Sequence, residues 1–427
     1  MTRDRPDQDG PTRAYVLHPD LRSSRKARQP ADALAEAVAL AAALPDLEVA
    51  GAEVVRVATV HAGMLFGSGK IAELKARFDE AGVGLVLVDG PVSPVQQRNL
   101  EKEWGVKLLD RTGLILEIFA DRARTREGVL QVELAALSYQ RTRLVRAWTH
   151  LERQRGGFGF VGGPGETQIE ADRRAIDEEV LKLRRQLAKV VRTRALHRAA
   201  RRKVPFPIVA LVGYTNAGKS TLFNRMTGAE VLAKDMLFAT LDPTMRGVVL
   251  PSGQKVILSD TVGFISDLPT QLVAAFRATL EEVLEADLIL HVRDIAHPET
   301  EEQAADVRAI LESLGVADEV PVFDVWNKID LLPEEARAAL LVQDARSPGI
   351  HAVSALTGEG LVPLLDAIEE RLGSERFPAA VTLPFSDGRR RAWLYENGVV
   401  TGEEDAEEGH RLRLLWTARQ KAAFEAL

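Results

Sequence analysis

The residues best suited to chemistry lie in a glycine-rich run near the middle of the chain. The run Gly213-Tyr-Thr-Asn-Ala-Gly-Lys-Ser220 has the spacing of a phosphate-binding loop. In this pattern backbone N–H groups turn onto phosphate oxygens, the lysine neutralises the outer phosphates and the final hydroxyl binds Mg²⁺. An apolar run, 208–212, precedes the loop, and a helical pattern, 221–226, follows it. This strand-turn-helix context predicts a real phosphate site rather than a chance match.

A second motif, Asp260-Thr-Val-Gly263, ends another predicted strand at about the usual distance after a phosphate loop. We expect Asp260 to hold Mg²⁺ through water and Gly263 to offer its N–H to the γ-phosphate. Alone this signal is weak, because many strands end in aspartate. After a phosphate loop it predicts the magnesium side of a nucleoside triphosphate site, with Lys219, Gly263 and a threonine between the two motifs as the catalytic group.

A third motif predicts which base the nucleotide carries. It is Asn327-Lys-Ile-Asp330, which follows the apolar run 320–325. Asp330 would accept from the N1–H and exocyclic amine of guanine, a donor pair that adenine lacks. A site built for those donors rejects adenine, because the carboxylate would stay unpaired. Asn327 would anchor the base region, Lys328 would lie along the ring, and a backbone N–H of 354–356 would meet the guanine oxygen.

The segment 237–244, Leu-Phe-Ala-Thr-Leu-Asp-Pro-Thr, lies between the first two motifs. A GTPase needs a threonine here to complete Mg²⁺ coordination, and spacing leaves both Thr240 and Thr244 open. We expect a switch that the γ-phosphate orders. The predicted nucleotide-binding residues are Gly213, Tyr214, Thr215, Asn216, Ala217, Gly218, Lys219, Ser220, Thr221, Phe238, Ala239, Thr240, Leu241, Asp242, Asp260, Thr261, Val262, Gly263, Asn327, Lys328, Asp330, Ser354, Ala355 and Leu356.

Two residues bear on the rate of hydrolysis. Phe264 stands where many GTPases place a water-orienting glutamine, and a phenyl ring cannot hydrogen-bond a water. We therefore predict slow intrinsic hydrolysis. Asn216 stands where potassium-dependent relatives place a cation ligand, so K⁺ is a candidate second cofactor beside Mg²⁺. The alternative, that Asn216 only buttresses the loop, stays equally open.

The elements that must position these residues alternate strands with helices, which predicts an α/β fold. The chain has 427 residues and 46% are hydrophobic, more than one core normally serves. The predicted organisation is a disordered leader at 1–11, an α/β domain at 12–125, a helical hairpin at 126–203, a GTPase domain with a mostly parallel sheet at 204–374, and a small α+β unit at 378–427. Gly67-Ser-Gly-Lys70 lacks full phosphate-loop spacing and predicts a plain strand-to-helix turn.

The predicted hairpin consists of two amphipathic stripes around a glycine-rich loop at 156–165, which holds six glycines within ten residues. From Leu181 to Lys203 there are ten Lys or Arg and no acid. Five further arginines line the other arm, at positions 141, 143, 146, 153 and 155. A solvated helix face is the bland interpretation, but the absence of acids favours nucleic-acid contact. Arg141 interrupts the first stripe, which costs stability unless its head reaches water.

The tail beyond Ala379 holds no constellation of reactive groups. Two strands are expected there, at 381–383 and 412–416, with a short helix at 387–395. The acidic run 402–409 is expected to be a loop.

Composition narrows the class of protein. The formal net charge is −7, which does not suggest wholesale nucleic-acid binding. There is no cysteine, so a disulfide scaffold and a thiolate zinc site are excluded. No apolar run is long enough to span a bilayer, and the N-terminus lacks the apolar stretch of a secretory signal. A monomeric cytoplasmic protein is the expectation.

Beyond the nucleotide motifs, the chain resembles the HflX family of ribosome-associated GTPases over nearly its whole length. The resemblance rests on 122–131 (Arg-Ala-Arg-Thr-Arg-Glu-Gly-Val-Leu-Gln), on 163–174 (Gly-Pro-Gly-Glu-Thr-Gln-Ile-Glu-Ala-Asp-Arg-Arg) and on 238–244. It favours Thr240 as the magnesium threonine. It also implies binding to the large ribosomal subunit and its ribosomal RNA, and splitting of stalled or idle ribosomes, notably after heat stress.

In that family the hairpin and its loop would approach the peptidyl-transferase region. The residues carried over as ribosome contacts are Gly156, Gly157, Phe158, Phe160, Gly163, Arg173 and Arg174. One position departs from the family pattern, because Gly162 stands where members often carry arginine before the Gly-Pro-Gly-Glu run. A positive contact is then missing or is supplied elsewhere.

Three rival functions remain open at this point. The first is a GTPase of ribosome assembly, and the second is a nucleotide-gated interaction module with negligible turnover. The complete magnesium apparatus, Ser220 and Asp260, argues against the second. The third is an ATP-driven RNA remodeller that uses ATP in the N-terminal domain, which Asn327 and Asp330 oppose at the main site.

Overall fold

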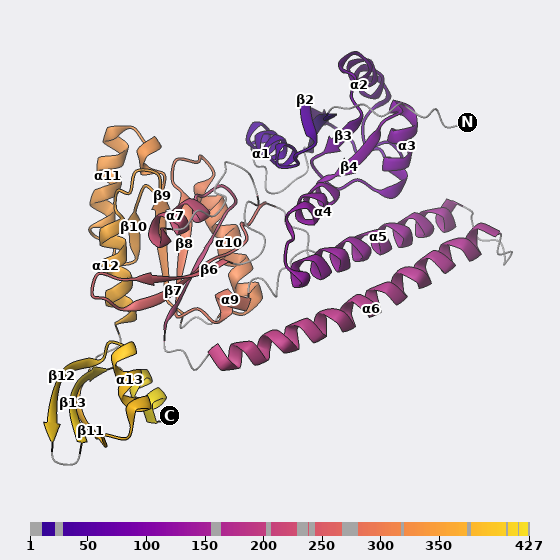
Figure 1. Cartoon of the computed structure of the whole chain (residues 1–427). Coiled ribbons are helices and arrows are strands. Elements are labelled where there is room, and N and C mark those ends of the chain that lie inside the picture. The colour runs from indigo at the N-terminus through magenta and orange to yellow at the C-terminus, as the bar shows by residue number, and fades with distance from the viewer. Residues whose placement is uncertain are drawn as a thin grey trace. The chain divides into compact units, whose positions relative to one another are not determined.

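The computed structural model describes residues 11–21, 29–154, 164–201, 206–228, 238, 244–266, 281–316, 320–373, 377–406, 409–416 and 418–425. The chain divides into two compact units. The first holds residues 1–190 with two short segments, 234–242 and 267–278, and the second holds the remainder. Figure 1 shows the elements of each unit. The mixed α/β class expected from the sequence is confirmed.

The N-terminal domain is built on a four-stranded parallel sheet of order β2-β1-β3-β4. Its elements are β1 (Thr12–Leu21), α1 (Pro30–Ala42), β2 (Leu47–Val57), α2 (Ser68–Ala81), β3 (Leu85–Val88), α3 (Pro94–Trp104), β4 (Lys107–Asp110) and α4 (Arg111–Arg122). Sequence chemistry sets the helix starts: Ser93 and Gln96 form a capping box on α3, and the Asp110 carboxylate caps α4. The core holds Leu17, Leu74, Phe78, Leu100 and Trp104.

The run Gly67–Lys70, which lacks full phosphate-loop spacing, is the start of an ordinary helix. Gly67 precedes the first turn of α2, and the Lys70 ammonium lies 2.7 Å from Glu53 and 3.0 Å from Glu73. The charge of Lys70 is therefore already neutralised by protein carboxylates. This agrees with the strand-to-helix turn expected from the incomplete spacing.

Two long helices, α5 (Arg126–Gln154) and α6 (Pro164–Arg201), run antiparallel beside each other (Figure 1). Helix α6 begins at Pro164, so the last two residues of the predicted loop 156–165 are helical; proline suits a first helical turn because its missing N–H is not needed there. Arg141 keeps half of its side chain exposed while its Nε lies 2.7 Å from Asp177 of α6. The stripe is thus interrupted by an arginine whose head does reach water.

The GTPase domain has a six-stranded sheet of order β10-β9-β8-β5-β7-β6, parallel except for the edge pair β6–β7. Its strands are β5 (Ile208–Gly213), β6 (Thr244–Val249), β7 (Lys255–Asp260), β8 (Leu288–Asp294), β9 (Val322–Asn327) and β10 (Ile350–Ala352). Its helices are α7 (Lys219–Thr227), α9 (Glu281–Leu284), α10 (Thr300–Leu314), the 3₁₀ turn η1 (Ile329–Leu331), α11 (Glu334–Asp344) and α12 (Leu361–Leu372). The carboxyl ends of the parallel strands carry the predicted motifs.

The C-terminal domain is a three-stranded antiparallel sheet of order β11-β13-β12 with two helices. Its elements are β11 (Phe377–Leu383), α13 (Gly388–Glu396), β12 (Val400–Ala406), β13 (Gly409–Trp416) and α14 (Ala418–Glu425). Its core is closed by Leu383, Leu394, Leu412, Trp416 and Phe424.

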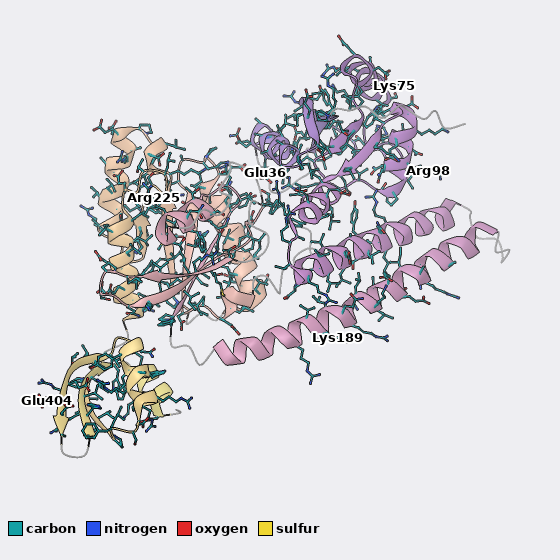
Figure 2. The ribbon with its side chains drawn as sticks, viewed as in Figure 1. Glu36, Lys75, Arg98, Lys189, Arg225 and Glu404 are labelled. Carbon is teal, nitrogen blue, oxygen red and sulfur yellow. The ribbon has the colours of Figure 1, made fainter. Side chains whose placement is uncertain are left out.

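Two expectations from the sequence were wrong. The acidic run expected as a loop is mostly the edge strand β12, because β13 opposite it supplies partners for the acids: the Arg413 guanidinium lies 3.0 Å from Glu404, and the His410 imidazole lies 2.8 Å from Asp405. Figure 2 labels Glu404 on this sheet. Arg143 is not a free cation of the basic arm, since its guanidinium lies 3.0 Å from the buried carboxylate of Asp110.

Candidate nucleotide-binding site

The phosphate loop leaves β5 at Gly213 and enters α7 at Lys219. Two glycines have positive φ, +150° at Gly213 and +90° at Gly218, and a side chain at either would collide with its neighbour. The neighbour of Gly213 is the Val292 carbonyl, and the neighbour of Gly218 is the Asn327 amide. Only glycine therefore allows the loop to lie this close to β8 and β9. The spacing read from the sequence corresponds to a real close approach.

Lys219 is buried at the base of the loop. Its ammonium donates to the backbone carbonyls of Gly213, at 3.0 Å, and Tyr214, at 2.8 Å. Burial lowers the pKa of Lys219 to about 8, and the nearby Asp260 carboxylate opposes that shift. Among the described residues, the hydrogen-bond acceptors of this buried cation are two backbone carbonyls, so Lys219 is suited to receive phosphate oxygens.

Ser220 and Asp260 form the candidate magnesium site. The Ser220 hydroxyl donates to Asp260 Oδ2 at 2.7 Å, and Asp260 is fully buried at the carboxyl end of β7. A hydroxyl and a carboxylate are oxygen donors, the type that Mg²⁺ prefers. The pair fits the metal that P-loop GTPases generally use.

Gly263 lies against the phosphate loop. A Cβ at this position would lie 2.8 Å from Thr215 Cγ2 and 3.0 Å from Lys219 Nζ, so glycine is required for the close approach. The next residue, Phe264, is 1% exposed, and its backbone bonds to the loop through Thr215 N–H to Phe264 O at 2.6 Å. The Phe264 ring therefore belongs to the core rather than to the phosphate pocket.

Asn327 joins the three loops of the site. Its amide donates to the Ala217 carbonyl at 2.8 Å, and its oxygen accepts from the Ala355 N–H at 2.9 Å. The phosphate loop, the end of β9 and the segment 354–356 are thus held together by one buried side chain. Asp330 follows in η1 and is partly exposed.

The segment 354–356 turns tightly after β10. Ser354 is fully buried, and its hydroxyl accepts from the Thr357 N–H at 3.1 Å. Leu356 is 72% exposed. The loop thus presents its backbone beside Asn327, as the sequence predicted for a contact with the guanine oxygen.

One residue of the base pocket was missed from the sequence. Asp294 ends β8, and its carboxylate accepts from the Lys328 ammonium at 2.7 Å, while Lys328 has a positive φ of +67°. The signal was available, because Asp294 ends a buried strand in the same way as Asp260. Asp294 fixes the direction of the lysine that is predicted to lie along the base.

Other predicted residues have different neighbours or lie outside the described residues. Phe238 is 2% exposed, and its ring packs edge-on to Phe119 of α4 with centroids 4.6 Å apart. Ala239, Thr240, Leu241 and Asp242 lie outside the described residues, and Thr244 begins β6. The candidate ribosome contacts Gly156, Gly157, Phe158, Phe160 and Gly163 also lie outside them.

Arg173 and Arg174 are described, and both are exposed on α6. Arg173 lies 3.9 Å from Asp177, one turn further along the helix. Arg184, Arg185 and Lys189 are exposed on the same helix (Figure 2 labels Lys189).

The fold and the site together define the class. A phosphate loop, an Asp-Thr-Val-Gly motif and an Asn-Lys-x-Asp motif at the carboxyl ends of one mostly parallel sheet are the parts of a P-loop GTPase, an enzyme that binds GTP and GDP and hydrolyses GTP.

Comparison with known proteins identifies the family. The chain belongs to the HflX family of GTPases. Four family models match it: "GTP-binding GTPase N-terminal" over residues 31–120, "GTP-binding GTPase Middle Region" over 122–201, "50S ribosome-binding GTPase" over 208–328 and "HflX C-terminal domain" over 339–426. The last begins within α11, well before the predicted C-terminal unit.

Individual relatives agree with this assignment. "GTPase HflX" of Magnetococcus marinus is 53% identical over 85% of this chain and 83% of its own length. "GTPase HflX" of Escherichia coli is 46% identical over 84% of this chain and 85% of its own length. Among solved structures, a GTP-binding protein of Sulfolobus solfataricus in complex with GDP matches with a TM-score of 0.47 and 24% identity, covering 84% of this chain and 98% of that one. Among the described residues, no helix is both long and apolar enough to cross a membrane.

Proposed function

We propose that this GTPase binds the large ribosomal subunit, hydrolyses GTP slowly when alone and faster on the ribosome, and splits stalled or idle ribosomes, including under stress. One observation carries the proposal: Phe264 fills the place of a water-orienting residue with a ring that is 1% exposed. A site without that group needs positioning or charge from a partner. The match of residues 208–328 to a family described as a 50S ribosome-binding GTPase supports the large ribosomal subunit as that partner.

The residues of the site have separate roles in this proposal. Lys219 exchanges its two carbonyl partners for β- and γ-phosphate oxygens, and Gly263 donates its N–H to the γ-phosphate. When bound, Mg²⁺ supplies positive charge to the same phosphates, and Ser220, Thr240 and Asp260 would hold it, Asp260 through water. Asp330 selects guanine, while Asn327 keeps the phosphate and base loops at a fixed separation.

The ribosome-facing part is proposed to be the hairpin 126–203, with its glycine-rich loop approaching ribosomal RNA. Arg173 and Arg174 are exposed near the loop end of α6. Exposed Arg184, Arg185 and Lys189 extend the positive charge along the helix. Phosphate contacts from such residues give affinity that falls steeply with salt. The domain limits 12–125, 204–374 and 378–427, a monomeric state and a cytoplasmic location complete the proposal.

Asn216 is proposed as a K⁺ ligand in the phosphate loop. It has a positive φ of +61°, a conformation that asparagine tolerates better than most residues. A K⁺ between the phosphates would supply charge that the site otherwise lacks. Hydrolysis is then expected to be faster in KCl than in NaCl of equal concentration, and equal rates would leave Asn216 with a loop-supporting role alone.

Nucleotide-dependent sedimentation tests the proposal. The full chain is centrifuged with isolated large subunits, isolated small subunits and intact ribosomes, each with GDP or a non-hydrolysable GTP analogue. Binding to large subunits with the analogue, and conversion of intact ribosomes to subunits, are expected. Binding only to subunits, with intact ribosomes left whole, would favour ribosome assembly instead. Equal rates of GTP hydrolysis with and without ribosomes would contradict the proposal.

A further inference from the structure

Thr215, the third residue of the phosphate loop, carries a buried hydroxyl that the fold does not use. Thr215 is 7% exposed. Within the part of the chain that the structure describes, its Oγ1 is buried and has no hydrogen-bond partner. Leaving a hydroxyl unpaired costs about 1–3 kcal/mol, so such an atom in a binding loop calls for a partner that the protein itself does not provide.

Neighbouring hydroxyls of the site are already engaged in other bonds. Ser220 donates to Asp260 at 2.7 Å, and Thr261 donates to the Leu211 carbonyl at 2.6 Å. The Tyr214 hydroxyl pairs with Ser266. Among the described residues, these hydroxyls have hydrogen-bond partners, whereas the Thr215 hydroxyl has none.

The surroundings of Thr215 place it at the γ-phosphate end of the site. A Cβ added to Gly263 would lie 2.8 Å from Thr215 Cγ2, 2.9 Å from Thr215 Cα and 3.0 Å from Lys219 Nζ. Gly263 and Lys219 are the residues expected to meet the outer phosphate. The Thr215 side chain is thus packed beside both of them, and its backbone is fixed by the bond from its N–H to the Phe264 carbonyl at 2.6 Å.

We propose that the Thr215 hydroxyl is a catalytic hydrogen-bond donor to a γ-phosphate oxygen during GTP hydrolysis. It compensates in part for Phe264, whose buried ring can make no such bond. In the reaction the water oxygen bonds to the γ-phosphorus, the bond from that phosphorus to the bridging oxygen breaks, GDP keeps the electron pair, and the water proton passes to phosphate oxygen. Thr215 loses no proton in this step; its hydrogen bond strengthens as charge develops.

Two substitutions distinguish a role of the Thr215 hydroxyl in hydrolysis from a role of the Thr215 side chain in packing. The variant Thr215→Val keeps the shape of the side chain and removes the hydroxyl. The variant Thr215→Ser keeps the hydroxyl and removes the methyl group that touches Gly263. The control Thr227→Val removes a hydroxyl at the end of α7 that donates to the Phe223 carbonyl of the same helix at 2.7 Å.

The experiment measures single-turnover GTP hydrolysis by the full chain with enzyme in excess and no ribosomes, together with GDP affinity. We expect Thr215→Val to lower the rate by at least about tenfold, in line with the loss of one transition-state donor. GDP affinity should stay within about twofold, because GDP has no γ-phosphate. Thr215→Ser and Thr227→Val should keep rates within about threefold of the parent chain.

Three results would each overturn the assignment. They are a Thr215→Val rate equal to that of the parent, equal impairment of the Val and Ser variants, or a parallel loss of GDP affinity in Thr215→Val. The inference rests on GTP hydrolysis and not on the ribosomal partner. Its failure would therefore leave the sedimentation test untouched.

Discussion

Lys219 shows how burial of one side chain sets the pH behaviour of the empty site. Burial lowers its pKa from the ordinary 10.5 to about 8. Between these two values the folded chain binds fewer protons than the unfolded chain, so its stability rises with pH across this window. Below about pH 8 the buried ammonium carries its full desolvation cost. Phosphate oxygens would stabilise the charged form and bring the pKa back up.

Nucleotide binding should therefore take up protons near pH 8.5. Lys219 is mostly neutral in the nucleotide-free protein at that pH and should be protonated beside GDP, while the phosphates of GDP are already ionised at pH 8.5. Calorimetry of GDP binding in buffers of different ionisation enthalpy should give an uptake of more than roughly half a proton at pH 8.5. At pH 6.5 the uptake from Lys219 should vanish. Heats that do not depend on the buffer at pH 8.5 would contradict this account of Lys219.

Asn327 should contribute equally to the affinities for GTP and GDP, because its side chain joins two loops of the site and is not expected to contact the γ-phosphate. The change Asn327→Ala leaves the Ala217 carbonyl and the Ala355 N–H without their present partner. We expect a loss of about 1–3 kcal/mol in the unfolding free energy of the nucleotide-free chain, with weaker binding of both nucleotides.

Denaturant unfolding and nucleotide titration would measure both effects of Asn327→Ala. The matched control is Asn397→Ala in the C-terminal domain, whose amide donates to one helix carbonyl, Trp393, at 2.7 Å. The control should leave both nucleotide affinities unchanged. Selective loss of GTP binding in Asn327→Ala would show that Asn327 reads the γ-phosphate state instead of joining loops.

At the scale of elements, Asp110 attaches the hairpin to the N-terminal sheet. Its buried carboxylate caps α4 through the Gly113 N–H at 2.8 Å and accepts from the Tyr139 hydroxyl of α5 at 2.6 Å. Arg143 of α5 lies 3.0 Å away from the same group. One aspartate at the end of β4 therefore starts one helix and fixes the direction of the next.

Asp110→Ala should destabilise the first unit by about 3 kcal/mol or more, because a helix cap is lost and a largely buried arginine loses its carboxylate. The control is Asp177→Ala, which removes the exposed pair with Arg141 and should cost less than about 1 kcal/mol. Denaturant unfolding, with hydrogen exchange along α5, measures both. Similar losses of stability in the two variants would contradict the role of Asp110 in joining α4 and α5 to the sheet.

The same elements show how far sequence reasoning reaches. Elements with clear periodicity or a cap were predicted close to their observed limits, as for the helix expected at 387–395, which is α13 at 388–396 with Asp387 as its N-cap. Helix α4 and strand β6 were not predicted. The apolar run 114–119 of α4 hides helical periodicity because nearly all of it is buried, and β6 is defined by its antiparallel pairing with β7. Patterns within one segment cannot reveal such tertiary partners.

The site was predictable to a similar extent. The phosphate loop, Asp260 and Asn327 were found from spacing, because each sits at the end of a strand where the chemistry dictates residue type. The hydrogen bond from Lys328 to Asp294, and the buried Thr215 hydroxyl that has no partner among the described residues, depend on side-chain packing between segments far apart in the chain. The sequence did not show that Arg143 is paired for the same reason, since its partner Asp110 lies 33 residues earlier in the chain.

At the scale of the whole molecule, an acidic chain carries a local basic arm. The net charge is −7, yet α6 exposes Arg184 and Arg185 in a stretch without acids. Reversing both, Arg184→Glu with Arg185→Glu, should weaken sedimentation with large ribosomal subunits and flatten its dependence on salt. GTP hydrolysis without ribosomes should not change, because neither residue belongs to the nucleotide site.

The matched control for the basic arm reverses two exposed cations of the GTPase sheet, Arg246→Glu with Lys255→Glu. It changes the net charge by the same amount and should affect ribosome binding much less. Equal weakening in the two double variants would mean that overall charge, not the hairpin, governs the association.

The choice of purine by one carboxylate is the claim on which the nucleotide assignment depends, and calorimetry of the full chain with GTP and ATP measures it directly. We expect clear binding of GTP, binding of ATP that is weaker by at least about 100-fold, and loss of most of that preference in Asp330→Ala. Equal binding of GTP and ATP by the parent chain, or an unchanged preference in Asp330→Ala, would contradict it.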